Sequence, residues 1–169
     1  RLDAEAVRDS MLSFAGILDF YPIDGSPVAR ISEGRQGLFQ LAREVASNPS
    51  VNRSIYLPIV RDQIPDVLSV FDYPDASLVN GQRETTNVPS QSLFLLNNPE
   101  AISIADAFAR RVAEQEGSPL DRLAYAYSLA FSRAPTPEEL TAIRTFWMRF
   151  PEQVSGGKAS KEARDTAQL

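Results

Sequence analysis

The sequence predicts a mainly helical fold, an irregular bundle of about six helices with one short extended segment. Three observations support this prediction. Apolar residues recur at helical spacing in several segments, proline and hydroxyl capping signals open helices in the second half, and only one short run has strand character. The 169 residues, 43% of them hydrophobic, suffice for a core without disulfides or metal. We expect a single helical domain over residues 1–150 and a polar tail, frayed or disordered, over 151–169.

The first half of the chain contains three predicted helices and the extended segment. Apolar residues at spacings of three to five predict helices over 2–18 and 36–47, and a shorter helix follows over 65–71. Between them, Ser54–Val60 is the one run with strand character. Pro58 restricts it to an edge strand or an isolated extended segment, because proline cannot donate to a sheet ladder.

The second half has clearer boundaries. Pro89 suits the first turn of a helix that runs to Leu96, and a helix over 99–115 follows it. Ser118 with Asp121 predicts a capping box that opens the next helix, and Thr136 opens a last helix that reaches Phe150.

Two missing residue types exclude several chemistries. The chain has no Cys and no His. Thiol nucleophiles, disulfides, thiolate or imidazole zinc sites, attached haem and Ser-His-Asp machinery are therefore excluded. We assign no catalytic residue, no metal ligand and no cofactor.

The charge balance bears on partners. A formal net charge of −5 disfavours nucleic acid as a partner, since phosphate-binding proteins present basic faces. No apolar run approaches the roughly 18 residues of a membrane span. The chain opens in helical pattern without an initiator Met or a leader, so we expect it to be one domain of a longer protein.

The densest group of polar residues lies in the region with least regular pattern. The candidate binding residues are Arg53, Tyr56, Arg61, Asp72, Asp75, Arg83 and Gln91. One interpretation is a surface on which Arg and Tyr engage a carbohydrate or an acidic partner. The other is structural: the arginines pair with the aspartates and fasten the irregular segment to the helices.

Two more specific hypotheses concern Asp72 and Asp75. The pair has the residue types of a glycosidase carboxylate pair, and with Asn80 it has those of a calcium loop. Both patterns are weak, because an acidic chain offers many such pairs and the alternation of an EF-hand loop is missing.

Three aromatic residues, Phe146, Trp147 and Phe150, lie near the end of the last predicted helix. They fit either a core or an interface to a neighbouring domain, and we keep them as candidate interface residues.

Several strings, read in order, resemble one family. They are Arg1–Leu12, Arg53–Arg61, Phe71–Asp75, Arg83–Gln91, Leu95–Pro99 and Phe131–Leu140. Together they resemble the domain of unknown function 1553, the C-terminal domain of large planctomycete-type exported proteins. The resemblance covers most of the chain and departs from the family pattern at Ser90 and at Phe14–Gly16.

The resemblance implies context more than activity. Such proteins carry signal peptides and combine this domain with cytochrome-c-like and sometimes carbohydrate-binding modules, which implies an exported, periplasmic or extracellular location. The family pattern also continues into a further C-terminal helix, so an exposed apolar patch is expected here. We therefore expect a non-catalytic scaffold or docking domain whose partners are other domains of the same protein. The alternative is a carbohydrate-binding or carbohydrate-active domain, with polysaccharide as the ligand.

Overall fold

The computed structural model describes residues 2–22, 50–57, 59, 64–75 and 78–154. Within these ranges the protein is mainly helical, as predicted, with six α-helices and one short 3-10 helix. The chain divides into two compact units, Arg1–Arg111 and Val112–Leu169. The helix predicted over 36–47 and the tail predicted over 155–169 lie outside the described residues.

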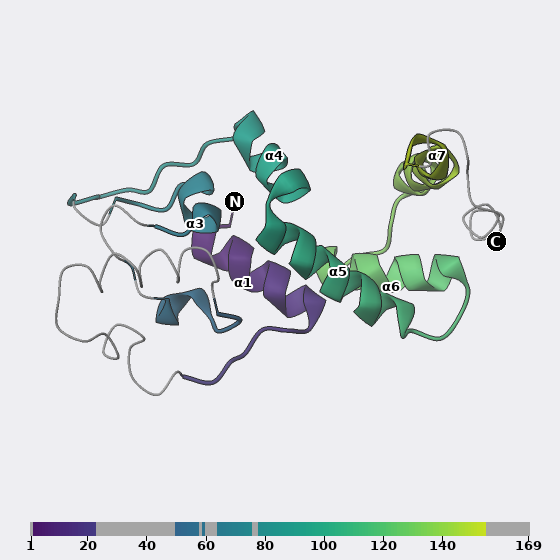
Figure 1. Ribbon diagram of the computed structural model, residues 1–169, viewed down its shortest axis with the longest axis horizontal. Helices are drawn as coiled ribbons and strands as arrows, with labels where there is room; N and C mark the ends of the chain where they lie inside the picture. The colour runs from purple at the N-terminus through teal and green to yellow at the C-terminus, as the bar shows by residue number, and fades with distance from the viewer. Residues whose placement is uncertain (1, 23–49, 58, 60–63, 76–77, 155–169) are drawn as a thin grey trace. The chain divides into compact units, whose positions relative to one another are not determined.

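The first unit is organised around helix α1, Ala4–Ala15. The 3-10 helix η2, Ser54–Tyr56, and helix α3, Asp66–Val70, both pack against α1, and α4, Pro89–Asn97, packs against α3. Figure 1 shows α3 beside the N-terminal end of α1. In helix α5, Pro99–Ala113, the Phe108 ring meets the Phe14 ring of α1 edge-on, with centroids 4.8 Å apart.

One hydrophobic core lies among these elements. Its buried residues are Ala4, Met11, Leu12, Ala15, Leu57, Val67, Leu68, Phe94, Ala101 and Ile104. They come from α1, α3, α4, α5 and the residue that follows η2. The core therefore fixes the elements that carry the polar residues of the candidate site.

Helix α1 ends at Gly16, whose left-handed backbone conformation favours glycine. Gly16 has φ +77°, and its N–H donates to the carbonyls of Leu12 and Ser13. Arg111 of α5 then donates from Nη1 to the carbonyl oxygens of Ser13 and Phe14, at 3.0 and 2.8 Å. These bonds satisfy carbonyls that the end of a helix leaves without a partner.

The prediction of an extended segment is wrong for Ser54–Tyr56. Ser54–Tyr56 forms a 3-10 helix, because the Asp9 carboxylate accepts hydrogen bonds from both the backbone N–H and the hydroxyl of Ser54, at 2.8 and 2.6 Å. The described residues contain one parallel bridge, between Asp19 and Asn52, and no strand. A tertiary contact 45 residues away thus overrides the local apolar pattern.

The second unit contains α6, Pro119–Phe131, and α7, Pro137–Val154. The predicted capping box is present: the Ser118 hydroxyl accepts from the N–H of Asp121, whose carboxylate accepts from the N–H of Ser118 at 2.8 Å. Helix α7 starts after Thr136 as predicted and continues four residues past the expected end at Phe150.

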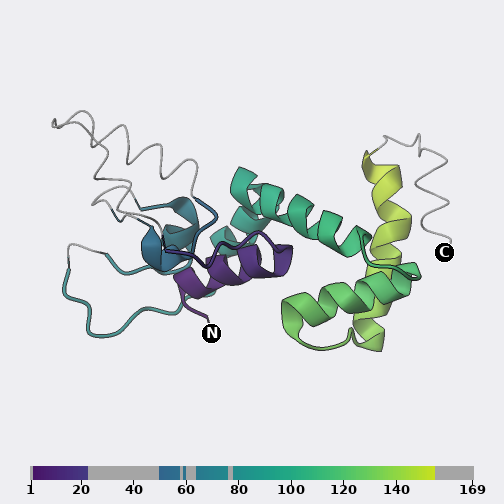
Figure 2. The ribbon, with the colours of Figure 1, turned by 90° about the horizontal axis from the view of Figure 1, so that it is seen from below.

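Neither α6 nor the described side chains of α7 contribute a buried residue. All buried residues in the described part of the chain lie at or before Ile104. Figure 2 shows α6 and α7 as two long helices joined by a short connection. The second unit therefore has amphipathic helices whose apolar sides are at most half-buried.

Candidate functional site

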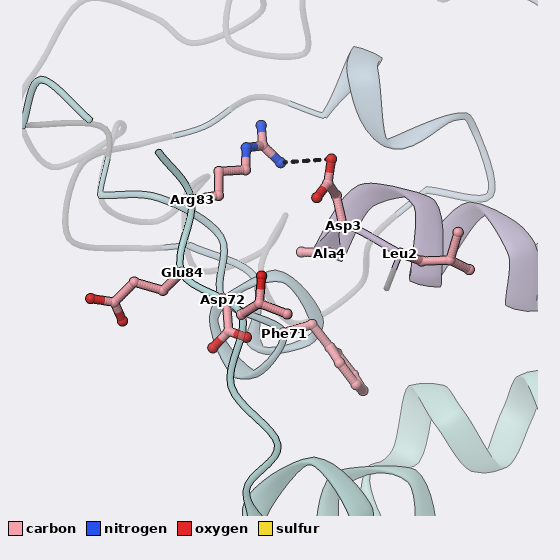
Figure 3. A pocket seen from close by; sticks show the side chains of 8 residues that line it. Leu2, Asp3, Ala4, Phe71, Asp72, Arg83 and Glu84 are labelled. Carbon is pink, nitrogen blue, oxygen red and sulfur yellow. Dashed lines mark ion pairs between the residues drawn. The ribbon is translucent and has the colours of Figure 1, made fainter. Parts of the chain in front are cut away.

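Arg83 is held by acidic residues at the start of α1. Its guanidinium forms a bidentate ion pair with Glu5, with Nη1–Oε2 and Nη2–Oε1 distances of 2.7 and 2.9 Å. It also lies 3.8 Å from the Asp3 carboxylate. Figure 3 shows the Arg83 side chain directed towards Asp3. The Arg83 hydrogen bond lowers the pKa of Glu5, and the same bond raises the pKa of Arg83. The Arg83 guanidinium also lies over the Tyr73 ring, 5.8 Å from its centroid.

Arg53 is held in a similar way. Its Nε lies 3.9 Å from the Asp9 carboxylate, which also anchors the first residue of η2. Both described arginines among the predicted binding residues are therefore paired with acids of α1. Glu5 and Asp9 were not among the predicted binding residues. Glu5 lies in the first turn of α1, where the helix dipole favours an acid whether or not it has a partner.

A cleft of about 430 Å³ lies among these residues. Its rim carries the charged side chains of Asp3, Glu5, Asp9, Arg53 and Arg83. The other described lining residues are Ala6, Ser54, Ile55, Leu57, Ile59 and Tyr73. We refer to it as the α1 cleft. A second, much smaller hollow of about 10 Å³ shares Asp3 and Arg83 with it and is lined also by Asp72 and Glu84 (Figure 3).

Asp72 and Gln91 form a separate polar cluster. The Asp72 carboxylate accepts from the N–H and the hydroxyl of Thr86 at 2.8 and 2.7 Å. The buried Gln91 amide donates to the carbonyl oxygens of Val70 and Thr86 at 3.1 and 3.3 Å. These bonds fasten the end of α3 to the segment before α4. Asp72 adopts the left-handed conformation with φ 66°, which a non-glycine residue adopts only when its surroundings hold it there.

The seven predicted binding residues do not all lie in one described cluster. Arg53 and Arg83 line the α1 cleft, whereas Asp72 and Gln91 are joined through Thr86. Tyr56 is half-buried in η2 and is absent from the described lining of the cleft, and Asp75 is exposed. Arg61 lies outside the described residues.

The most buried charged residue was not predicted. Arg8 of α1 is fully buried, with its Nε 3.3 Å from Glu100 and its Nη1 3.0 Å from the carbonyl oxygen of Asn52. It also donates to the Ser54 hydroxyl and to the Ser50 carbonyl. Burial lowers the pKa of Arg8, and burial raises the pKa of Glu100 against the opposing effect of Arg8.

The helical phase of α1 contains the signal that was missed. Arg8 stands four residues after Ala4 and four before Leu12, and therefore lies on the buried stripe. An arginine in such a stripe indicates an internal partner, because an unpaired buried charge is costly.

The candidate interface residues lie on α7. Phe146 and Phe150 are 55% and 47% exposed, with ring centroids 5.0 Å apart, while Trp147 is half-buried. On α6, Leu120 and Phe131 are also exposed. Both helices of the second unit therefore carry exposed apolar side chains.

The loop before α7 is fixed by a charged pair. Arg133 forms a bidentate ion pair with Glu139, in which both N–O distances are 2.7 Å. Its guanidinium also lies over the rings of Tyr127 and Phe131. The Glu139 carboxylate also accepts from the N–H of Thr136. The pair with Arg133 lowers the pKa of Glu139 to about 2.

Metal binding and membrane crossing can both be assessed over the described ranges. Among these residues, no group of three or more acidic side chains is arranged to hold a metal ion. None of the described helices has the length and apolar character needed to cross a membrane.

The fold and these contacts define a helical domain whose described polar cluster is largely engaged in internal pairs. The family model for a protein of unknown function, DUF1553, matches residues 1–147, and the chain belongs to this family. Searches among curated proteins and among solved structures give no match.

Proposed function

We propose that this domain is a non-catalytic docking module of an exported multidomain protein, and that α6 and α7 carry the docking surface. The observation that supports this proposal most is the distribution of burial. The described part of the second unit buries no side chain, yet its helices are amphipathic and present large apolar residues. Apolar surface exposed in this way is typical of an interaction site.

The contact residues of this proposal are Phe131, Phe146 and Phe150, with Trp147 at the margin. Aromatic side chains dominate binding energy at protein interfaces, because they bury a large area with few rotatable bonds. The Phe146 and Phe150 rings stand one turn apart on α7, as the two anchors of a helix that packs into a groove do. The partners we propose are other domains of the same exported protein; the exported location rests on the resemblance of the sequence.

The acids of α1 that lie beside Arg53 and Arg83 favour this function over carbohydrate binding. Arg83 is hydrogen-bonded to Glu5 and Arg53 lies 3.9 Å from Asp9, so a sulfated or acidic sugar would meet a carboxylate beside each of them. Docking through α6 and α7 does not involve these two arginines.

Hydrogen exchange in the presence of the partner domains tests the proposal. We expect amide protection over 119–131 and 137–150 to rise when the partner domains are added. The double variant Phe146→Ser/Phe150→Ser should lose most of this gain, whereas Val79→Ser, which changes an exposed apolar residue of the first unit, should retain it. Unchanged protection of both helices in the unsubstituted chain would show that they are not the docking surface.

A further inference from the structure

The described lining of the α1 cleft contains both apolar and acidic residues. The described lining carries three carboxylates, of Asp3, Glu5 and Asp9, and two guanidinium groups. The described lining therefore carries one carboxylate more than it carries guanidinium groups. Asp3 is the most exposed of the three acids, since the side chains of Glu5 and Asp9 are 28% and 20% exposed. The Asp3 side chain is 67% exposed and lies 3.8 Å from Arg83, which is longer than a hydrogen bond.

A second carboxylate lies close by. Glu84 follows Arg83 in the chain, is exposed, and lines the small hollow that shares Asp3 and Arg83 with the cleft. Figure 3 shows the Glu84 side chain directed away from the Arg83 guanidinium, and Glu84 belongs to the lining of the small hollow and not to the described lining of the α1 cleft. The local field therefore favours a cation.

The apolar residues of the cleft indicate which kind of cation it would bind. Ile55, which is 72% exposed, and the half-buried Ile59 provide hydrocarbon surface, whereas Leu57 is buried in the core. A simple metal ion gains nothing from such surface. An arginine or lysine side chain does, since its methylene stem covers apolar atoms while its charged end reaches a carboxylate. The cleft volume of about 430 Å³ lies within the range of roughly 300–1,000 Å³ typical of small-ligand sites.

We propose that the α1 cleft binds a basic side chain of a partner polypeptide, with the stem against Ile55 and Ile59 and the cationic end on Asp3. A guanidinium fits better than an ammonium, because it can pair with Asp3 and share the Glu5 carboxylate with Arg83. This surface is distinct from α6 and α7, so the inference goes beyond the proposed docking function.

The test compares three acetylated and amidated pentapeptides, Ala-Leu-X-Leu-Ala, in which X is Arg, Gln or Glu. Each is titrated into the ¹⁵N-labelled 169-residue chain at low salt. We expect the Arg peptide to shift the amides of Glu5, Ser54 and Leu57 in a saturable way, and added salt to weaken its binding. The Gln and Glu peptides should cause smaller shifts.

Two variants locate the charge and the apolar contact. Asp3→Asn should weaken binding of the Arg peptide about two- to fivefold, which is the effect of losing one exposed ion pair. It should not unfold α1, because the Asp3 side chain makes no capping hydrogen bond that the substitution could remove. Asp106→Asn removes an exposed acid of α5 and serves as the matched control. Ile55→Ser should also weaken binding, with Val79→Ser as its control.

Three outcomes would overturn the proposal. The first is no saturable shift with the Arg peptide up to millimolar concentration. The second is equal or tighter binding of the Glu peptide, which would mean that Arg53 and Arg83 open to receive an anion. The third is binding that Asp3→Asn leaves unchanged, with shifts confined to α6 and α7.

Discussion

The carboxylate of Asp72 accepts both the N–H and the hydroxyl of Thr86, and it does so from a backbone in the left-handed region. This pair closes the segment between α3 and α4. The buried Gln91 amide reinforces it by donating to the Thr86 carbonyl. The Asp72–Thr86 pair is thus a structural fastening, and substitutions at Asp72 should be read first as changes in stability.

Asp72→Ala should lower the free energy of unfolding by about 2 kcal/mol, because two hydrogen bonds to a charged acceptor are lost. Asp72→Asn should cost less, since asparagine tolerates the left-handed conformation and keeps one acceptor oxygen. Urea unfolding measures both. Glu84→Ala, an exposed acid nearby, is the control and should stay within about 0.5 kcal/mol of the parent chain.

Arg8→Met should destabilise the first unit more than Asp72→Ala does. It leaves Glu100 partly buried without its counter-ion, and three oxygens without a donor, for a loss of about 3–5 kcal/mol. Urea unfolding measures this loss as well. A value below about 1 kcal/mol, the range of an exposed ion pair, would show that Arg8 is not the central contact of the first unit.

The same variant should respond to pH in a defined direction. Burial already raises the pKa of Glu100, and removal of Arg8 takes away the effect that opposes burial. A carboxyl with a raised pKa binds more protons in the folded state than in the unfolded state, so its stability contribution falls as pH rises from 4.5 through the raised pKa. Arg8→Met should therefore be less destabilising at about pH 4.5 than at about pH 8. Urea unfolding at both pH values checks this, with Arg8→Met/Glu100→Gln as the control that should lose the difference.

Local sequence signals predicted most helix boundaries and missed what depends on distant partners. The capping box of Ser118 and the proline at position 89 each mark a helix start from neighbouring residues alone. The 3-10 helix at Ser54 depends on Asp9, and no window around residue 54 contains that information. For the site, composition and spacing predicted Arg53 and Arg83 as candidate binding residues, but their partners on α1 are 44 and 78 residues away.

Glu139 should titrate near pH 2, because Arg133 and the start of α7 favour its charged form. Its folded pKa lies below the ordinary value of 4.5, so its contribution to the stability of α7 is present above about pH 4.5 and is lost as pH falls through about 2. Side-chain carboxyl ¹³C shifts measure the titration. Arg133→Gln should move the midpoint up towards 4.5, and an unmoved midpoint would mean that the ion pair does not form in solution.

Gly16→Ala should destabilise the first unit by about 1 kcal/mol or slightly more, because alanine is strained at φ +77°. A Cβ atom there would also stand 3.2 Å from the Arg111 side chain. Arg111→Ala should remove two hydrogen bonds to the end of α1 but relieve that crowding. Thermal unfolding of the two single variants and the double variant should show a double-variant loss smaller than the sum.

The partners of Arg8 have a consequence for how the protein is made. They begin 42 residues further along the chain, at Ser50, and end 92 residues further along, at Glu100. At about 5–20 residues per second, a ribosome needs roughly 5–20 s after α1 emerges to deliver the last of them. During that time the acid available to Arg8 on α1 itself is Asp9, whose carboxylate lies 3.9 Å from the guanidinium in the folded protein. A chain that ends before Glu100 lacks the carboxylate that approaches the Arg8 Nε at 3.3 Å, and leaves this cation on the apolar stripe of α1 without that partner.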